Sequence, residues 1–410
     1  MHEHPHPAGR RGGGRPTFEV ADIFRTFGPA YLRDHVLSPS EERVLRNVID
    51  CRTATLGGHK DWCPNCELEH PSYNSCRDRH CPTCQFLDQA RWVEGRQKRV
   101  LPVHHFHVVF TLPAELRPLT RSNPKLVYGL LFKAVSQTLL TLGKDRLGAL
   151  LGITAVLHTW TRDMQFHPHL HCICTAGGLA LDGERWVPSR LDYLFPDEVM
   201  RRLVRGKVLD GLKRAYKAGK LALNGTSAEL ATAVAFHDLI DRLYGKKWVL
   251  YAKRPFGGSD QVLKYLGQYT HRVAISSYRI AEVDGDRITI RTRDERTTQV
   301  SADEFIRRFL LHILPKGFRK IRHYGLMAST NVPTRLERAR EILTPEADPE
   351  EPQVEPCNDE SDSETWENLL ERLVGEHARL CPRCRKARMI RVAEIPPDPY
   401  AGALGYLDSS

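Results

Sequence analysis

The sequence predicts an α+β protein with a mostly antiparallel sheet. Some segments have apolar residues at helical spacing and others have the alternation of a strand, but the two kinds do not follow one another as regular strand–helix–strand units. Asp284-Gly285 lies between two apolar runs and is a strong β-hairpin signal, and a hairpin joins neighbouring strands in antiparallel order. We therefore expect antiparallel strands with helices packed against them.

The individual elements follow from periodicity and from breakers such as Gly and Pro. The first helical stretch, 18–48, has Ser40 as its expected cap before two glutamates. Further helices are expected at 85–99, 123–142, 197–217, 227–244, 260–269 and 366–380. Strands are expected at 104–112, 152–160, 169–175, where Gly177-Gly178 ends the strand, 248–252, 277–283 and 287–292.

Changes in composition divide the chain into five parts. We expect a disordered basic and His-rich tail (1–16), a helical and zinc-binding domain (17–100), a larger α+β domain (101–330), an acidic linker (331–365) and a C-terminal helix with a CxxC pair (366–410).

The 410 residues include 60 Lys and Arg against 50 Asp and Glu, a net charge of +10. The stretch 345–367 contains ten acids and no base, so the rest of the chain carries +10 + 10 = +20. Such a charge favours a polyanionic partner, although an unspecialised basic surface would give the same balance. No apolar run approaches the ~20 residues of a membrane helix, and the N-terminus lacks the apolar segment of a signal peptide. We expect a cytoplasmic, nucleoid-associated protein without membrane contact.

The 11 cysteines are an odd number and occur largely as CxxC pairs, a pattern typical of reduced, metal-binding thiols. Two pairs separated by 14 residues predict one tetrahedral structural Zn²⁺ site. Its expected ligands are Cys63, Cys66, Cys81 and Cys84. A second zinc site from Cys51, His59, Cys76 and His80 is an open alternative to packed or solvent-facing side chains.

Near the C-terminus, Cys381 and Cys384 form half of a metal site. Cys357 and His377 are candidates to complete it, and so is a partner chain.

A His-Pro-His-Leu-His-Cys-Ile-Cys run suggests catalysis. On a strand, His169 and His171 share one face, while Leu170, Cys172 and Cys174 point to the other. Two imidazoles on one face form a platform for a divalent metal, although most such pairs are ordinary polar or buried histidines.

Tyr265 and Tyr269 are spaced i, i+4, so that on a helix both hydroxyls reach the same point. Buried aromatic packing is the alternative. With a metal to polarise a phosphate, a tyrosine can attack it and form a 5′-phosphotyrosine, which retains the energy needed for rejoining.

With these motifs the chain resembles the zinc-containing rolling-circle transposases of the insertion-sequence ninety-one type, among the His-hydrophobe-His endonucleases. The resemblance covers about residues 48–327 through the blocks CRTATLGGH, SCRDRHCPTCQ, FHVVFTLP, FHPHLHCICTAGG, YLGQYTHRVAISSYRI and LPKGFRKIRHYGL. It implies an N-terminal zinc-binding domain and a nuclease domain with a central antiparallel sheet flanked by helices. It also implies His169 and His171 as ligands of a catalytic Mg²⁺ or Mn²⁺, and Tyr265 and Tyr269 as nucleophiles.

Such endonucleases usually have a third metal ligand, for which Asp163, His158 and Gln268 are candidates. The expected partners are single-stranded DNA at transposon ends and target DNA. Because no Walker-type motif occurs, strand separation requires a host helicase or supercoiling. The expected DNA contacts are Lys264, Arg272, Lys316, Arg319, Lys320 and Arg322.

Two other functions remain open at this point. One is a plasmid-type replication initiator or relaxase with the same chemistry, and the other is a non-catalytic zinc-finger DNA-binding protein. The oligomeric state is not predicted.

Overall fold

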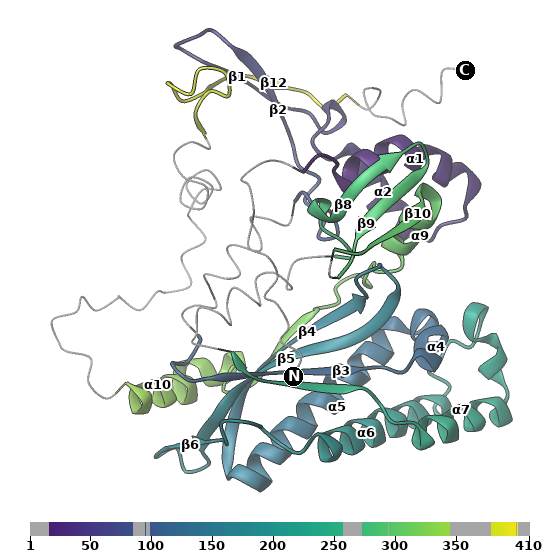
Figure 1. Ribbon diagram of the computed structural model, residues 1–410, viewed down its shortest axis with the longest axis vertical. Helices are drawn as coiled ribbons and strands as arrows, with labels where there is room; N and C mark the ends of the chain where they lie inside the picture. Colours follow the sequence, from purple (N-terminus) through teal and green to yellow (C-terminus); the bar gives the residue numbers. More distant parts are fainter. Residues whose placement is uncertain are drawn as a thin grey trace.

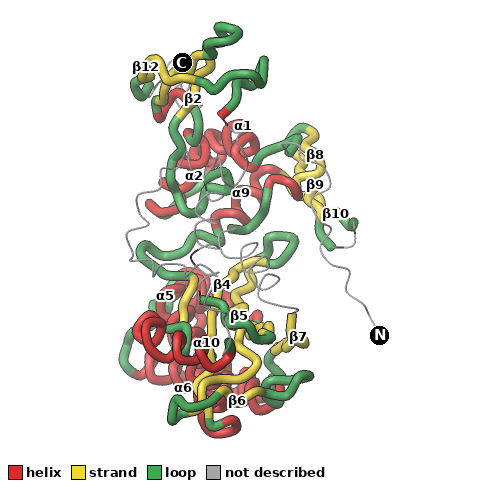
Figure 2. The backbone as a smooth tube through the Cα atoms, turned by 90° about the vertical axis from the view of Figure 1, so that its left-hand side faces the viewer, coloured by secondary structure: helices red, strands yellow, loops and turns green. Residues whose placement is uncertain are grey.

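The computed structural model describes residues 16–84, 95, 99–256, 273–293, 295–344, 379–398 and 400. These residues form three tiers along the longest axis of the molecule (Figures 1 and 2). A small three-stranded sheet lies at one end, a bundle of helices with a second small sheet lies in the middle, and the largest sheet with its helices forms the other end. The mixture of helices and antiparallel strands confirms the predicted α+β class.

The largest sheet, called the main sheet below, has the strand order β11-β4-β5-β3-β7, with β6 paired to β5. Every neighbouring pair is antiparallel. Its strands are β3 (His105–Thr111), β4 (Ala149–Trp160), β5 (Phe166–Ala180), β6 (Trp186–Pro188), β7 (Leu250–Phe256) and β11 (Ile321–Gly325). β5 is longer than expected, because it continues through Gly177 to pair with β6.

The helices of this tier lie on one face of the main sheet (Figure 1). They are α4 (Arg117–Ser122), α5 (Pro124–Leu142), α6 (Asp197–Lys217) and α7 (Ala233–Gly245). Alternate residues of the strands, such as Phe106 and Leu170, join the helices in the largest core. The segment Pro124–Leu147 is long and apolar enough to span a membrane by length and composition, but 61% of its apolar window is buried inside the protein.

The middle tier joins segments that are distant in sequence. α1 (Val20–Asp34) and α2 (Pro39–Asp50) share a core with α9 (Ala302–Leu310), β8 (Ile280–Asp284), β9 (Arg287–Arg291) and β10 (Thr297–Ser301). The rings of Phe24 and Phe309 meet edge to face, with their centroids 5.0 Å apart. This core therefore crosses the domain boundary expected at residue 100.

Two local predictions are corrected here. The cap of α2 is Ser38, not Ser40: its hydroxyl accepts a hydrogen bond from the Glu41 amide, and Pro39 occupies the first helical position, which suits proline. The expected linker begins later than residue 331, because α10 (Glu337–Leu343) is helical and Leu336 and Ala339 are buried in a third core. The predicted hairpin at Asp284-Gly285 is confirmed by β8 and β9.

The third tier is the sheet β12-β1-β2, called the terminal sheet below. It consists of β1 (Gly58–Trp62), β2 (Glu69–Tyr73) and β12 (Ile390–Ile395), so that a hairpin from the first fifth of the chain shares a sheet with a strand close to the C-terminus. Short 3-10 or π turns link the elements of the three tiers at Ala54–Leu56, Ala114–Leu116, Gly143–Leu147, Gly225–Ala231, Ser277–Arg279, Ser329–Asn331 and Val332–Leu336. Four predicted segments lie wholly or mostly outside the described residues. They are the tail 1–16 apart from residue 16, the helix 85–99 apart from residues 95 and 99, the helix 260–269, and the helix 366–380 apart from residues 379 and 380.

Candidate functional site

The face of the main sheet opposite the helices carries a cluster of histidines. On β5, Leu170, Cys172 and Cys174 are buried in the helix-side core, which places His169 and His171 on the opposite face. The antiparallel register sets His158 of β4 directly across from His169. His158, His169 and His171 each offer a ring nitrogen, and these nitrogens all lie within 4.8 Å of one another. We call these three residues the histidine cluster.

Hydrogen bonds fix the orientation of two of these rings. Nδ1 of His169 lies 2.6 Å from the carbonyl oxygen of His167, so it donates to that oxygen and leaves the Nε2 lone pair free. Nε2 of His169 and Nε2 of His171 are 3.0 Å apart, so both point to the same place. Nδ1 of His171 lies 2.8 Å from Nε2 of His107, a residue of β3. This hydrogen bond holds the ring of His171 by the nitrogen that faces away from His169.

Burial keeps the rings of His169 and His171 uncharged at neutral pH. Loss of hydration lowers the pKa of His169 to about 4 and the pKa of His171 well below its usual value. A neutral imidazole offers a lone pair to a metal ion, whereas an imidazolium does not. Three imidazoles that converge on one sheet face therefore make a suitable donor set for a divalent transition metal.

The three candidates for a third ligand have different outcomes. His158 belongs to the histidine cluster. The Asp163 carboxylate instead accepts a hydrogen bond from the Thr161 hydroxyl. Gln268 lies outside the described residues, as do Tyr265, Tyr269, Lys264 and Arg272. The chain leaves the main sheet at Phe256, the end of β7, and is next described at Val273 in the middle tier.

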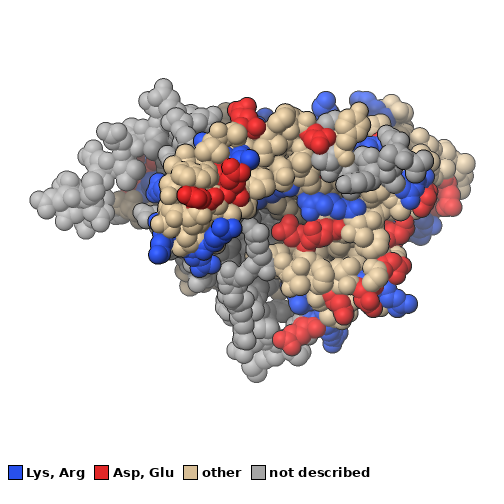
Figure 3. Space-filling model, turned by 90° about the horizontal axis from the view of Figure 1, so that it is seen from above, with Lys and Arg blue, Asp and Glu red and all other residues tan. Residues whose placement is uncertain are grey.

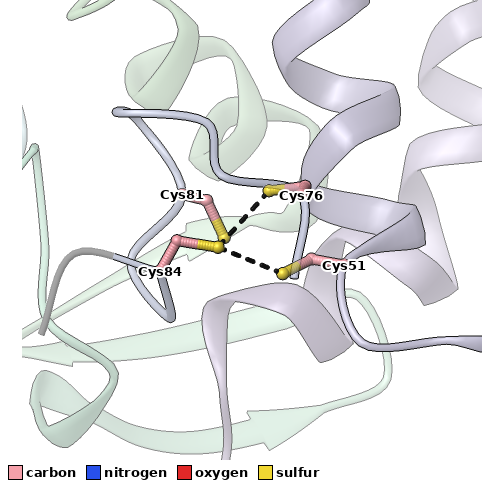
Figure 4. A group of neighbouring side chains, drawn as sticks. All are labelled: Cys51, Cys76, Cys81 and Cys84. Carbon is pink, nitrogen blue, oxygen red and sulfur yellow. Dashed lines mark hydrogen bonds between the residues drawn. The ribbon is translucent and has the colours of Figure 1, made fainter. Parts of the chain in front are cut away.

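The first cysteine cluster combines Cys51, Cys76, Cys81 and Cys84, whose sulfur atoms all lie within 4.8 Å of one another and point inward (Figure 4). Cys51 follows the last residue of α2, and the other three come from the loop after β2. The Cys84 sulfur lies 3.4 Å from that of Cys51 and 3.5 Å from that of Cys76. These distances are far longer than a disulfide bond and suit four ligands around one Zn²⁺.

The second cysteine cluster combines Cys63 and Cys66 with Cys381 and Cys384. The predicted grouping of Cys63 and Cys66 with Cys81 and Cys84 is thus wrong, because the structure divides these four residues between the two clusters. The reason is the β1–β2 hairpin, which has Cys63 and Cys66 at its turn. Each strand of the hairpin has five residues and rises ~3.3 Å per residue, so the turn lies ~17 Å from the base of the hairpin. The first cluster lies at that base.

His59 and His80 are not part of either cluster among the described residues. Both ring nitrogens of His80 have partners: Nδ1 lies 2.9 Å from the Asp78 carboxylate, and Nε2 accepts a hydrogen bond from the Leu314 amide at 3.2 Å. His59 lies 3.3 Å from the Asp61 carboxylate. Cys357 and His377, the expected completion of the C-terminal half-site, lie outside the described residues.

The basic residues predicted to contact DNA differ in exposure. Lys316 and Arg319 are exposed, whereas Lys320 and Arg322 are half-buried. The Arg322 guanidinium lies over the rings of Phe132 and Phe318, at 4.3 and 5.1 Å from their centroids. Burial and the nearby Arg79 lower the pKa of Lys320 to about 7. Arg322 thus has a packing role, and of the four, Lys316 and Arg319 are best placed to meet a phosphate.

Sequence reasoning missed His107 and the pairing of distant cysteines. His105 and His107 alternate on a predicted strand, so they share a face, and this signal was present in the sequence. The cysteine pairing had no local signal, because Cys63 and Cys384 are 321 residues apart.

Two family models match the chain. One, described as "Transposase zinc-binding domain", matches residues 23–112, and the other, described as "Putative transposase", matches residues 152–334. The chain is 41% identical over 384 residues to "Putative transposase y4qJ" of Sinorhizobium fredii, an alignment that covers 91% of this chain and 94% of that protein. The chain belongs to the IS91-type transposases.

A second relative of this transposase is the "Transposase for insertion sequence element IS801" of Pseudomonas savastanoi pv. phaseolicola. It is 29% identical over 320 residues, which are 76% of each chain. No solved structure matches the chain. The first cysteine cluster lies entirely within the zinc-binding match, and His158, His169 and His171 lie within the transposase match.

Proposed function

We propose that this transposase cuts and rejoins single-stranded DNA at the ends of its insertion sequence through a 5′-phosphotyrosine, as in rolling-circle transposition. The observation that carries this proposal is the convergence of the ring nitrogens of His158, His169 and His171 on the face of the main sheet opposite its helices. The family assignment supports DNA as the substrate. The expected site of action is the nucleoid in the cytoplasm.

The histidine cluster would hold the catalytic divalent metal. A cation bound there supplies charge withdrawal from the scissile phosphate and orients it for in-line attack. Mg²⁺ prefers oxygen ligands, whereas imidazole suits transition metals, so of the two expected ions Mn²⁺ fits this donor set better. The hydrogen bonds to His167 and His107 position His169 and His171 for that role.

The proposed nucleophiles are Tyr265 and Tyr269, supported by their i, i+4 spacing. In the cleavage step the phenolic oxygen forms a bond to phosphorus as the bond from phosphorus to the 3′-oxygen breaks. The phenol gives up its proton, and the 3′-oxygen takes one up. A new 3′-hydroxyl then attacks the phosphotyrosine and releases the tyrosine, so that rejoining needs no ATP. Two tyrosines would hold two strands in turn.

DNA binding is assigned to basic side chains beside the site, with Lys264, Arg272, Lys316 and Arg319 as the candidates. Strand separation is expected from a host helicase or from supercoiling, since the sequence has no Walker-type motif. The first cysteine cluster (Cys51, Cys76, Cys81 and Cys84) is proposed to hold a structural Zn²⁺ that fixes the loop after β2 against α2.

The proposal is tested with purified protein and single-stranded oligonucleotides from the ends of its element, labelled at the 3′ end. We expect a covalent protein–DNA adduct on a denaturing gel in Mn²⁺ and none in EDTA. Peptide mapping should place the DNA on Tyr265 or Tyr269. The Tyr265→Phe/Tyr269→Phe double variant should bind the oligonucleotide in a gel shift but form no adduct.

The metal ligands are tested in the same assay with His158→Ala, His169→Ala and His171→Ala, each of which should abolish the adduct. The matched control is His237→Ala, an exposed histidine of α7 outside the cluster. An adduct that persists in EDTA would rule out the metal mechanism. Binding without any cleavage by the wild type would favour a non-catalytic DNA-binding protein.

A further inference from the structure

The two CxxC pairs of the second cysteine cluster form turns of the same geometry. In the first, the Glu67 amide donates to the Cys63 carbonyl at 2.9 Å, and in the second, the Arg385 amide donates to the Cys381 carbonyl at the same distance. The residue after each second cysteine has a left-handed backbone, with φ of 56° at Glu67 and 53° at Arg385. Neither residue is glycine, so the surrounding contacts must hold this conformation. The C-terminal half-site is therefore a second knuckle that matches the first.

The sulfur atoms of the two knuckles face each other in crossed pairs. The Cys63 sulfur lies 3.6 Å from that of Cys384, and the Cys66 sulfur lies 3.6 Å from that of Cys381. All four are free thiols, and Cys63 and Cys381 are buried. A tetrahedron with Zn–S bonds of ~2.3 Å has edges of ~3.8 Å, close to these distances. The donor set is complete within one chain.

The terminal sheet has little apolar packing to hold it together. β12 is exposed at every residue but Ile395, and β2 is exposed at every residue but Ser72. Among the described residues of these three strands, none belongs to a hydrophobic core. Three strands of five or six residues without a core need another source of stability, and a bound metal is the common one in small modules.

We propose that Cys63, Cys66, Cys381 and Cys384 bind a second structural Zn²⁺, which joins the C-terminal segment to the N-terminal zinc-binding domain of the same chain. The matched zinc-binding family covers residues 23–112 and so contains only half of this site. The metal would hold β12 against β1 in the register that pairs Gly58 with Ile395 and Trp62 with Ile390.

The metal also determines where a group of basic side chains lies. Residues 379–393 contain no acid, and the exposed bases of this segment are Arg383, Arg385, Lys386, Arg388 and Arg391. Arg391 reaches across to β1, where its guanidinium lies 3.4 Å from the ring of His59. The proposed Zn²⁺ would thus keep this C-terminal basic group on the zinc-binding domain.

Zinc content of the full-length protein gives the first test. The Cys381→Ser/Cys384→Ser variant should hold one zinc fewer per chain than the wild type, and so should Cys63→Ser/Cys66→Ser. A sixfold variant that combines both pairs of changes with Cys76→Ser and Cys84→Ser should hold two zinc ions fewer per chain than the wild type. The matched control is Cys357→Ser, a cysteine of the same C-terminal region, which should keep the wild-type content. An unchanged content in Cys381→Ser/Cys384→Ser would overturn the proposal.

The decisive arm of the second test keeps all the cysteines, so it does not depend on the folding of a cysteine variant. A protease site is inserted in the segment 345–367 of the full chain and cut after purification. After the cut, the C-terminal fragment should elute together with the N-terminal fragment during gel filtration, and a chelator should separate the two. In Cys381→Ser/Cys384→Ser it should be released by cutting alone. A wild-type fragment that separates without chelator would overturn the proposal.

A site shared between two chains is the remaining alternative, and mixing separates it from the proposal. The Cys63→Ser/Cys66→Ser and Cys381→Ser/Cys384→Ser variants are combined, metal-stripped and reloaded with zinc. A site within one chain predicts that the mixture still lacks one zinc per chain. Recovery of about a quarter of the missing zinc with random pairing, or of half if all dimers are mixed, together with a dimer on gel filtration, would show a shared site and contradict the proposal.

Discussion

At the scale of single residues, the histidine cluster depends on a residue outside it. His107 is buried, and its Nε2 lies 2.8 Å from Nδ1 of His171, while Nε2 of His171 points to His169. A ring held in this way would keep the nitrogen proposed to bind metal in place, and loss of such a partner commonly costs 10- to 100-fold in metal affinity. His107 is therefore a positioning residue.

We expect His107→Ala to raise the Mn²⁺ concentration needed for half-maximal adduct formation by ~10-fold or more. His107→Gln should lie between Ala and the wild type, because its amide can still hydrogen-bond to His171. A metal titration of adduct formation measures both, with His237→Ala as the control. If the Mn²⁺ requirement of His107→Ala matched that of the wild type, His107 would have only a packing role.

At the scale of elements, Asp78 connects the loop of the first cysteine cluster to α2 and to the chain before β11. Its buried carboxylate accepts hydrogen bonds from Arg43, Asn47 and His80, and His80 in turn accepts one from the Leu314 amide. Burial alone would raise the pKa of Asp78, but the hydrogen bonds from His80 and Asn47 outweigh it and hold the pKa well below its usual value. The ionised carboxylate is thus part of the folded structure.

We expect Asp78→Asn to lower the free energy of unfolding by about 2 kcal/mol at pH 7, since charged hydrogen bonds in a buried site are lost. The folded-state pKa lies below the unfolded value of about 3.9, so this stabilisation is present above pH ~4 and is lost as the pH falls. Denaturant unfolding of the zinc-loaded protein at pH 7 measures the difference, with the exposed Glu42→Gln as control. A free energy of unfolding equal to that of the wild type would contradict the role of the charge.

At the scale of the whole molecule, the terminal sheet pairs β1 with β12, two strands more than 300 residues apart in sequence, at one end of the long axis (Figures 1 and 2). The face seen from that end has Lys and Arg side chains next to Asp and Glu side chains, with no uniform charge (Figure 3). The C-terminal basic group is therefore a local feature. Its position on the zinc-binding domain makes it a candidate for contacts with DNA phosphates.

We expect Arg383→Ala/Lys386→Ala to weaken binding to single-stranded ends without changing the zinc content. Loss of two phosphate contacts should reduce the slope of log affinity against log salt by about 1.4, at ~0.7 per contact. A gel-shift titration at several salt concentrations measures it. The control is Lys217→Ala/Lys220→Ala, two exposed bases at the end of α6. An unchanged slope would show that the group does not contact DNA.

The sequence by itself determined the local features of this transposase. The α+β class, the hairpin at Asp284-Gly285 and the shared face of His169 and His171 all follow from periods of two or 3.6 residues and from turn chemistry, which neighbouring residues decide. The tertiary structure decided which distant groups meet. His158 and His107 join the site through the register of β4 and β3 with β5, and the β1–β2 hairpin moves Cys63 and Cys66 away from Cys81 and Cys84 toward Cys381 and Cys384. The register of the strands and the position of the hairpin turn depend on packing across the whole fold, and the spacing of residues in the sequence does not contain that information.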